Sequence, residues 1–156
     1  MTMEPGNLLR RFLAADRVLT LTCDSKAEAL EVLLDCIGQT PQITDAGAFR
    51  EAILERESFM STGVGLGIGV PHARMESISD MVVVIGRCRQ PLLDYVGLDG
   101  SPVELIVMIG ATEKQHAEYL RLLASITASL KNDDFRGAVL TAESPDAAHK
   151  LLTEST

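Results

Sequence analysis

The sequence contains no tryptophan, and aromatic residues make up only 4% of its 156 residues. Hydrophobic residues still account for 46% of the chain, so we expect a core built from aliphatic side chains. No apolar run approaches the roughly 20 residues that a membrane-spanning helix needs, and the N-terminus lacks the apolar segment of a signal peptide. The composition therefore predicts a cytoplasmic globular protein with no direct membrane insertion.

Positive charge is also scarce, since 14 Lys and Arg residues stand against 22 Asp and Glu, which gives a net charge of -8. The longest basic cluster is Arg10-Arg11. Nucleic-acid binding needs a concentrated positive surface, so we predict no nucleic-acid partner. The three cysteines are widely spaced and form no CxxC pair, which indicates free thiols in a reducing compartment.

Signatures of metal and nucleotide sites are missing as well. The three histidines, His72, His116 and His149, are scattered and include no HExxH or HxH pattern. The glycine-rich stretch lacks the Gly-Lys-Ser/Thr end of a P-loop and does not match GxGxxG in register. We therefore predict no metal and no cofactor. A metal-dependent hydrolase that uses His72 and His116 remains a less favoured alternative.

Hydrophobic periodicity predicts alternating helices and strands along the whole chain. Ser25 to Glu28 matches a capping box that opens a helix. Helices are expected at about 8–13, 25–38, 45–57, 113–131, 133–140 and 144–152, and strands at 18–21, 63–70, 80–88, 92–96 and 103–109. The predicted architecture is a single α/β domain over residues 1–156, with a mixed β-sheet sandwiched between helices and a flexible tail at about 1–7.

The stretch STGVGLGIGVPHAR, residues 61–74, is the least ordinary part of the sequence. Four glycines alternate with branched apolar residues, at Gly63, Gly65, Gly67 and Gly69. This period of two predicts a strand with one bare face, which would allow another backbone or a partner's loop to approach closely. Pro71 is expected to end the strand because it lacks a donor, and His72 follows in a loop.

His72 is the candidate reactive group, because a neutral imidazole near pH 7 has a free lone pair. Arg56 is predicted in the last turn of the preceding helix, and its planar guanidinium matches phosphate oxygens. Ser61 and Thr62 offer hydroxyl groups, and exposed amides in the stretch with Gly67 and Gly69 could hold an anion. The alternative for a lone histidine here is simple local hydrogen bonding.

Residues GLGIGVPHAR resemble the active-site segment of the type-2 enzyme IIA proteins of the bacterial phosphoenolpyruvate-dependent phosphotransferase system. This group includes fructose, mannitol and nitrogen-regulatory members, and its motif runs STGxGxGIAxPHG. The upstream residues 54–58, LERES, resemble the family's RE segment. Residues 111–116, ATEKQH, resemble the segment that carries a second histidine. The likeness spans about residues 8–153.

The resemblance implies a mannitol-type IIA fold and a phosphoryl group carried on His72. The histidine phosphocarrier protein HPr would supply the group, and a cysteine or histidine of a IIB component would receive it. Arg56 and His116 would steady the group, with no metal or nucleotide involved. The alternative is a nitrogen-type regulatory module whose phosphorylation state controls a target protein. Ala73 replaces the family's usual glycine, and Gly69 stands where alanine is commoner.

Overall fold

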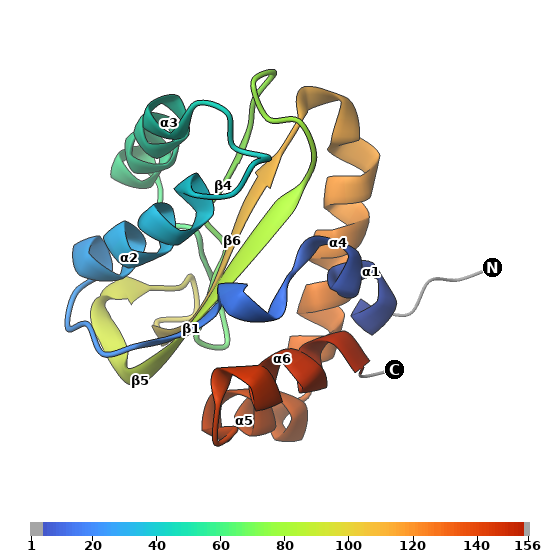
Figure 1. Ribbon diagram of the computed structural model, residues 1–156. Coiled ribbons are helices and arrows are strands. Elements are labelled where there is room, and N and C mark those ends of the chain that lie inside the picture. The colour runs from blue at the N-terminus through green and yellow to red at the C-terminus, as the bar shows by residue number, and fades with distance from the viewer. Residues whose placement is uncertain (1–4, 155–156) are drawn as a thin grey trace.

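A computed structural model describes residues 5–154 and shows one β-sheet between two layers of helices (Figure 1). The strand order is β1-β5-β6-β3-β2, and β4 also pairs with β6. The antiparallel pair β5 and β6 forms the centre of the sheet, whereas β1, β3 and β4 pair in parallel with their central neighbours. The predicted α/β class with a mixed sheet is confirmed.

The element bounds follow the expected alternation closely. The helices are α1 (Pro5–Phe12), α2 (Lys26–Gly38), α3 (Ala46–Phe59), α4 (His116–Leu130), α5 (Asp133–Thr141) and α6 (Pro145–Glu154), with short 3-10 turns at Ala15–Arg17 and Glu113–Gln115. The strands are β1 (Val18–Leu21), β2 (Gly63–Gly65), β3 (Ile68–Gly69), β4 (His72–Arg74), β5 (Val82–Val96) and β6 (Pro102–Ala111).

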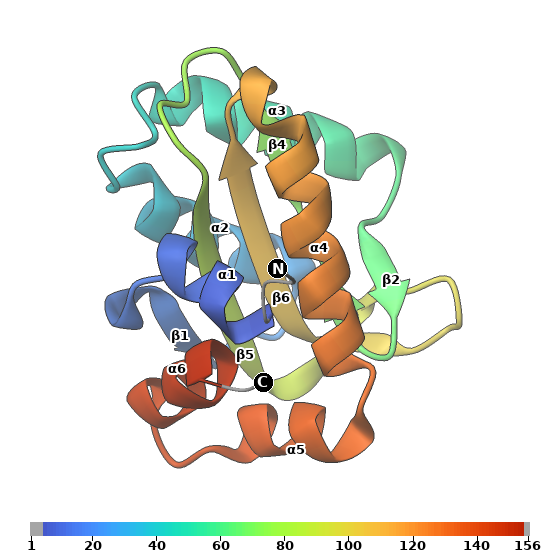
Figure 2. The same ribbon diagram turned by 90° about the vertical axis from the view of Figure 1, so that its right-hand side faces the viewer.

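The two faces of the sheet bury two separate hydrophobic clusters. Along β5, Val83 and Ile85 face the cluster under α1, α4 and α6, whereas Val82 and Val84 face the cluster under α2 and α3. Figures 1 and 2 show this division, with α4 lying across the sheet on one side and α2 on the other. A central strand covered on both faces has apolar residues on both sides, and residues 81–85, MVVVI, are all apolar.

Local capping explains where several helices begin. The Ser25 hydroxyl accepts a hydrogen bond from the Glu28 amide at 3.2 Å, so the predicted cap of α2 is confirmed. The buried face of this helix runs through Ala29, Leu33 and their neighbours, and Ala27 is exposed. Helix α1 begins at Pro5, within the segment expected to be a tail; residues 1–4 of that segment lie outside the described residues.

Two strand predictions were wrong in their bounds. The expected strands 80–88 and 92–96 are one bent strand, β5, whose register against β6 shifts between Arg87 and Leu92. Such a bulge lets a strand turn without breaking, which is why the polar residues in between looked like a loop. Strand β6 also continues to Ala111, through Gly110, where a break was expected.

No helix in the described part of the chain is long and apolar enough to cross a membrane.

A buried ion pair connects α2 and α3 to the sheet beside the glycine-rich stretch. Lys26 Nζ lies 3.0 Å from Glu57 Oε2, and only 5% of the Glu57 side chain is exposed. The same ammonium group stands 4.5 Å from the centre of the Tyr95 ring, a cation–π contact. Glu57 also accepts hydrogen bonds from the Thr62 hydroxyl and amide. Elements distant in sequence are thus joined by one carboxylate.

We predict that Lys26→Met destabilises the fold by about 3 kcal/mol, because it leaves the Glu57 carboxylate buried without its cation. Methionine preserves the side-chain length and the helix propensity, so charge loss dominates the effect. Urea unfolding measures the change. Arg50→Met is the matched control: it breaks the exposed Glu31–Arg50 pair and should cost under about 1 kcal/mol. Equal losses of unfolding free energy in the two variants would contradict the larger contribution that we assign to the buried pair.

Candidate functional site

The glycine-rich stretch is a tight hairpin, and the single strand expected there was wrong. Strand β2 pairs antiparallel with β3 in the register Gly63↔Gly69 and Gly65↔Ile68. The two residues between them, Leu66 and Gly67, have φ angles of 58° and 75°. Positive φ at both central positions is the signature of a type I′ turn, which matches the twist of a hairpin. The alternation of apolar residues hid this turn in the sequence.

The glycines face other parts of this chain and leave no open face for a partner. A Cβ atom added at Gly63 would lie 2.9 Å from the Gly97 Cα atom, and one added at Gly69 would lie 2.5 Å from the Tyr95 hydroxyl. Gly65 and Gly67 are likewise buried, whereas Val64 and Leu66 are exposed. The predicted close approach of another backbone is confirmed, whereas the alternative of a surface cleared for a partner's loop was wrong: the hairpin packs its bare side against the end of β5 and the loop after it.

Asp99, in the loop between β5 and β6, holds the turn of the hairpin. Its carboxylate accepts hydrogen bonds from the Leu66 amide at 2.9 Å and from the Ser101 amide and hydroxyl. Bonding to Ser101 and then to the Leu66 amide lowers the pKa of Asp99 to about 2. The Ser101 hydroxyl in turn accepts the Gly67 amide at 3.0 Å. The carboxylate thus remains ionised and bonded across the physiological pH range.

Ser61 and Thr62, predicted to support a bound anion, form hydrogen bonds with other residues of this chain. The Ser61 hydroxyl donates to the Val96 carbonyl at 3.3 Å and accepts from the Gly63 amide. The Thr62 hydroxyl bonds Glu57 and lies 2.5 Å from the Tyr95 hydroxyl. These contacts, like those of Gly67 and Gly69, shape the hairpin; the predicted role of the four residues in holding an anion stays a prediction.

His72 begins a short strand, β4, so the loop expected there was wrong. Pro71 interrupts the edge between β3 and β4, but both strands pair in parallel with β6, and the Pro71 carbonyl accepts from the Ile109 amide at 3.0 Å. The missing donor of proline costs one ladder bond without ending the alignment. His72 lies opposite Ile109 and Arg74 opposite Ala111, on the α4 face of the sheet.

One hydrogen bond fixes the state of the His72 ring. Its Nδ1 lies 2.8 Å from the Val70 carbonyl oxygen, which only accepts, so Nδ1 carries the proton in the neutral ring. The lone pair is then on Nε2. Burial lowers the pKa of His72, and the nearby positive charges of Arg56 and Arg74 lower it further, against the opposing effects of the Val70 carbonyl and Glu57. The imidazole is held neutral and nucleophilic at neutral pH.

Tyr119 and Arg74 belong to this site and were not predicted in it. The Tyr119 ring centroid lies 5.3 Å from that of His72, with the planes at 35°. Burial raises the pKa of Tyr119, while the charges of Arg56 and Arg74 oppose that shift. Both arginines are therefore within electrostatic reach of the two rings. Arg74 shares a face with His72, because residues i and i+2 of a strand lie on the same side, but the sequence carries no signal that residues 72–74 form a strand.

The structure brings Arg56 to the site, and it places His116 about one helical turn before Tyr119 in α4. Arg56 lies in the last turn of α3 and is exposed. His116 is the first residue of α4 and is exposed. It precedes Tyr119 by three residues, so both side chains lie on the same side of the helix. His149 is elsewhere, with its Nε2 2.9 Å from the Leu13 carbonyl, between α6 and α1.

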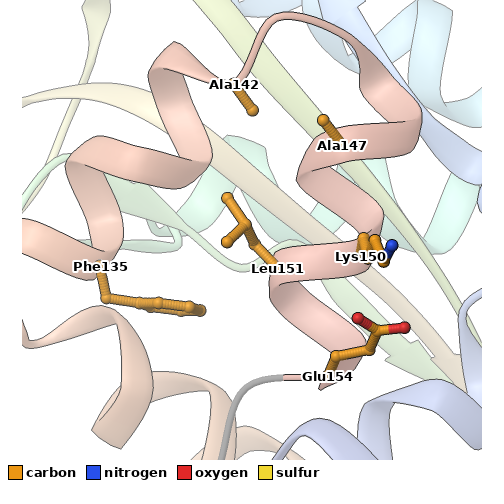
Figure 3. A pocket seen from close by; sticks show the side chains of 6 residues that line it. All are labelled: Phe135, Ala142, Ala147, Lys150, Leu151 and Glu154. Carbon is orange, nitrogen blue, oxygen red and sulfur yellow. The ribbon is translucent and has the colours of Figure 1, made fainter.

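A hollow of about 560 Å³ between α5 and α6 contains none of these groups. Figure 3 shows Phe135 of α5 and Leu151 of α6 facing this space, with Lys150 and Glu154 at its edge. It is lined mainly by apolar side chains and carries no nucleophile. Within residues 5–154, no group of three or more His, Cys, Asp or Glu side chains is arranged to hold a metal ion.

Comparison with known proteins connects this geometry to a family. The sequence profile described as "Phosphoenolpyruvate-dependent sugar phosphotransferase system, EIIA 2" matches residues 11–155. The chain is 34% identical to a fructose-specific EIIA component of Haloferax volcanii, over 83% of this chain and 84% of that protein. A nitrogen regulatory protein of Pseudomonas aeruginosa is 29% identical over the same shares. A fructose-specific EIIABC component of Bacillus subtilis is 33% identical over 87% of this chain, but the match spans only 21% of that protein.

Solved structures share the fold. The nitrogen regulatory protein IIA-Ntr of Neisseria meningitidis superimposes with a TM-score of 0.84 at 23% identity, covering 94% of this chain and 99% of that one. The mannitol enzyme IIA of Escherichia coli, in a complex with phosphorylated enzyme IIB, gives 0.75 at 19% identity over 90% of this chain and 96% of that one. The predicted mannitol-type architecture is confirmed by these neighbours.

We predict that Gly69→Ala destabilises the fold by about 1–3 kcal/mol, because the added methyl group overlaps the Tyr95 ring. Urea unfolding measures the loss. Gly137→Ala is the matched control: it lies in α5 with open space around it, so it should stabilise by up to about 1 kcal/mol. In a Tyr95→Leu background the cost of Gly69→Ala should shrink. A cost that is unchanged in that background would contradict the overlap.

We also predict that the His72 ring titrates below the ordinary value of about 6.5, with the proton on Nδ1 in the neutral form. Proton–nitrogen correlation NMR of the imidazole reports both properties. Tyr119→Ala should raise the inflection toward the ordinary pKa, because it opens the ring to water and relieves the burial that lowers the pKa. An inflection at or above 6.5 in the unaltered protein, or an Nε2 proton, would contradict this description of the site.

Proposed function

The chain belongs to the EIIA 2 family of the phosphoenolpyruvate-dependent sugar phosphotransferase system. On that premise we propose that His72 carries the phosphoryl group that this system transfers. Members of this family act as phosphocarriers or regulators of the system. The observation that supports His72 most directly is its hydrogen bond to Val70, since this bond places the proton of the neutral ring on Nδ1 and leaves the Nε2 lone pair free for attack.

The proposed step is an in-line exchange of one phosphorus–nitrogen bond for another. The Nε2 lone pair of His72 forms a bond to phosphorus while the bond to the donor's histidine nitrogen breaks and its electron pair returns to that ring. The proton stays on Nδ1, which donates it to the Val70 carbonyl throughout. Such transfers depend on positioning and on charge stabilisation, so neither a metal nor a nucleotide is needed.

Arg56 and Arg74 are proposed to stabilise the phosphoryl oxygens during the exchange. Their charges already act on the His72 ring, and a guanidinium group offers paired donors that match phosphate geometry. His116 is proposed to assist from the first turn of α4, where the positive end of the helix favours an anion. Tyr119 holds the ring orientation through the stacking contact.

HPr is the proposed donor and a IIB component the proposed acceptor. A IIB acceptor is supported by the related mannitol enzyme IIA, whose structure was determined with phosphorylated enzyme IIB. Regulation is the second candidate role, because the chain matches a nitrogen regulatory protein over the same share as it matches the fructose-specific component. In that role the phosphorylated and free forms would bind a target protein differently.

The test is phosphoryl labelling from phosphoenolpyruvate with enzyme I and HPr, followed by mass spectrometry at mildly alkaline pH. We expect one phosphate on His72 and none in His72→Ala. Arg74→Gln should slow labelling by about 10- to 100-fold, since one charge-assisted bond to phosphate is lost. The exposed Arg121, on α4, provides the control, and Arg121→Gln should label at the unaltered rate.

Label that persists in His72→Ala would overturn the assignment. Transport and regulation are then separated by mixing labelled protein with the IIB components of the same organism. Rapid transfer to one of them supports a phosphocarrier in sugar uptake. Stable label, together with a partner captured by only one of the two forms, supports the regulatory role.

A further inference from the structure

A second hollow, about 560 Å³ in volume, lies at the opposite end of the sheet from His72. It is lined by β5 and β6 on one side and by α5 and the start of α6 on the other. Along β6, Leu105 lies opposite Arg87 of this hollow and Ile109 lies opposite His72. The four-residue step from Leu105 to Ile109 corresponds to roughly 13 Å along the strand. The volume is in the range of small-molecule sites, and the hollow is separate from the proposed phosphoryl site.

A buried arginine without a carboxylate partner forms part of its wall. Arg87 is 5% exposed, and its Nη1 donates to the Val139 carbonyl at 3.1 Å and to the Ala142 carbonyl at 2.9 Å. Its Nη2 donates to the Thr20 hydroxyl at 2.9 Å, whereas its buried Nε has no hydrogen-bond partner. The carbonyls at the end of α5 offset only part of the charge. A buried cation without an anion is costly, so a bound anionic group would stabilise it.

Three more charged side chains line the same hollow: Arg89, Glu104 and Glu143. Among the described residues, none of these forms an ion pair within 4.0 Å, either with another or with Arg87. Two arginines and two glutamates therefore line one cavity without forming ion pairs with each other. A purely anionic ligand such as phosphate would meet the repulsion of both carboxylates. A ligand that carries one charge of each sign would satisfy both pairs.

We propose that this hollow binds a small zwitterion, for which a free α-amino acid is the simplest example. Its carboxylate would bind Arg87 and Arg89, and its ammonium group would bind Glu104 and Glu143. Charge-assisted bonds of this kind are among the stronger hydrogen bonds, and a guanidinium group can hold a carboxylate through two parallel bonds. The apolar side chains of Leu140 and Pro145 line the remaining space, where the side chain of the bound amino acid would lie.

The hollow adjoins the glycine hairpin through Glu104. The amides of Glu104 and Leu105 both donate to the Gly67 carbonyl, at 2.7 and 3.0 Å. A Cβ atom added at Gly67 would lie 3.5 Å from the Glu104 carboxylate. A ligand that engages this carboxylate would thus contact the strand that supports the hairpin. The binding site is proposed independently of the phosphoryl chemistry, and its test reads binding directly.

The test is calorimetric titration of the full chain with each of the 20 L-amino acids. We expect at least one to bind with 1:1 stoichiometry at millimolar affinity or better, and acetate, methylamine and inorganic phosphate to bind at least about tenfold more weakly. Arg89→Gln and Glu143→Gln alter exposed side chains and should each weaken binding by about tenfold. Arg121→Gln, outside the hollow, should leave the affinity unchanged.

Arg87→Met should abolish binding, and circular dichroism shows whether that variant is folded; the two exposed substitutions keep the test decisive if it is not. No binding of any amino acid up to about 10 mM would overturn the proposal. So would affinity that survives both exposed substitutions. Phosphate binding that Glu143→Gln strengthens would also overturn it, because the hollow would then be an anion site.

Discussion

The position of His72 depends on the close approach of the glycine hairpin to the end of β5. A Cβ atom added at Gly97 would lie 2.7 Å from the Gly65 amide nitrogen, and one added at Gly63 would meet the Val96 carbonyl. The two backbones therefore touch with no side chain between them. This contact sets the path of β3, and through Val70 and Pro71 it sets where β4 begins. The glycines therefore influence the position of His72 through packing.

Polar groups around Glu57 stabilise that approach from the other side. Its carboxylate joins Lys26 of α2, Thr62 of the hairpin and, at 3.4 Å, the hydroxyl of Tyr95. Burial is the main cause that raises the pKa of Tyr95, so the phenol stays neutral beside the carboxylate. Arg56 directly precedes Glu57, the residue that carries this anchored carboxylate. The buried network thus fixes the end of α3 from which Arg56 extends toward His72.

Much of the fold was predictable because its signals are local. The cap at Ser25 and the apolar run of β5 depend on neighbouring residues alone, and both predictions were confirmed. The hairpin was not predictable from its alternation, because Leu66 adopts a positive φ that only the bond from its amide to Asp99 explains. Arg74 was missed for a related reason. Strand β4 forms by pairing with β6, and a three-residue strand after a proline has no periodic signal of its own.

The Gly69 substitution shows how a departure from the family's motif is accommodated. Alanine is commoner at this position in the resembling proteins, yet here the Tyr95 ring occupies the space that a methyl group would need. Ala73, in place of the usual glycine, lies in a regular strand opposite Gly110, where a Cβ atom causes no strain. Both changes are therefore explained by the strand partner or the ring beside them.

Reversible transfer places opposing demands on a phosphoryl carrier, and the surroundings of His72 meet them in different ways. The proposed nucleophile has to be neutral, and burial of the ring, helped by the charges of Arg56 and Arg74, favours the neutral form against the opposing effect of the Val70 carbonyl. The phosphorylated state must not be too stable, or the group would not leave. Arg56 and Arg74 are exposed, so water screens their attraction for the phosphoryl oxygens. Burying the nucleophile while leaving the cations hydrated keeps the proposed exchange close to balance in both directions.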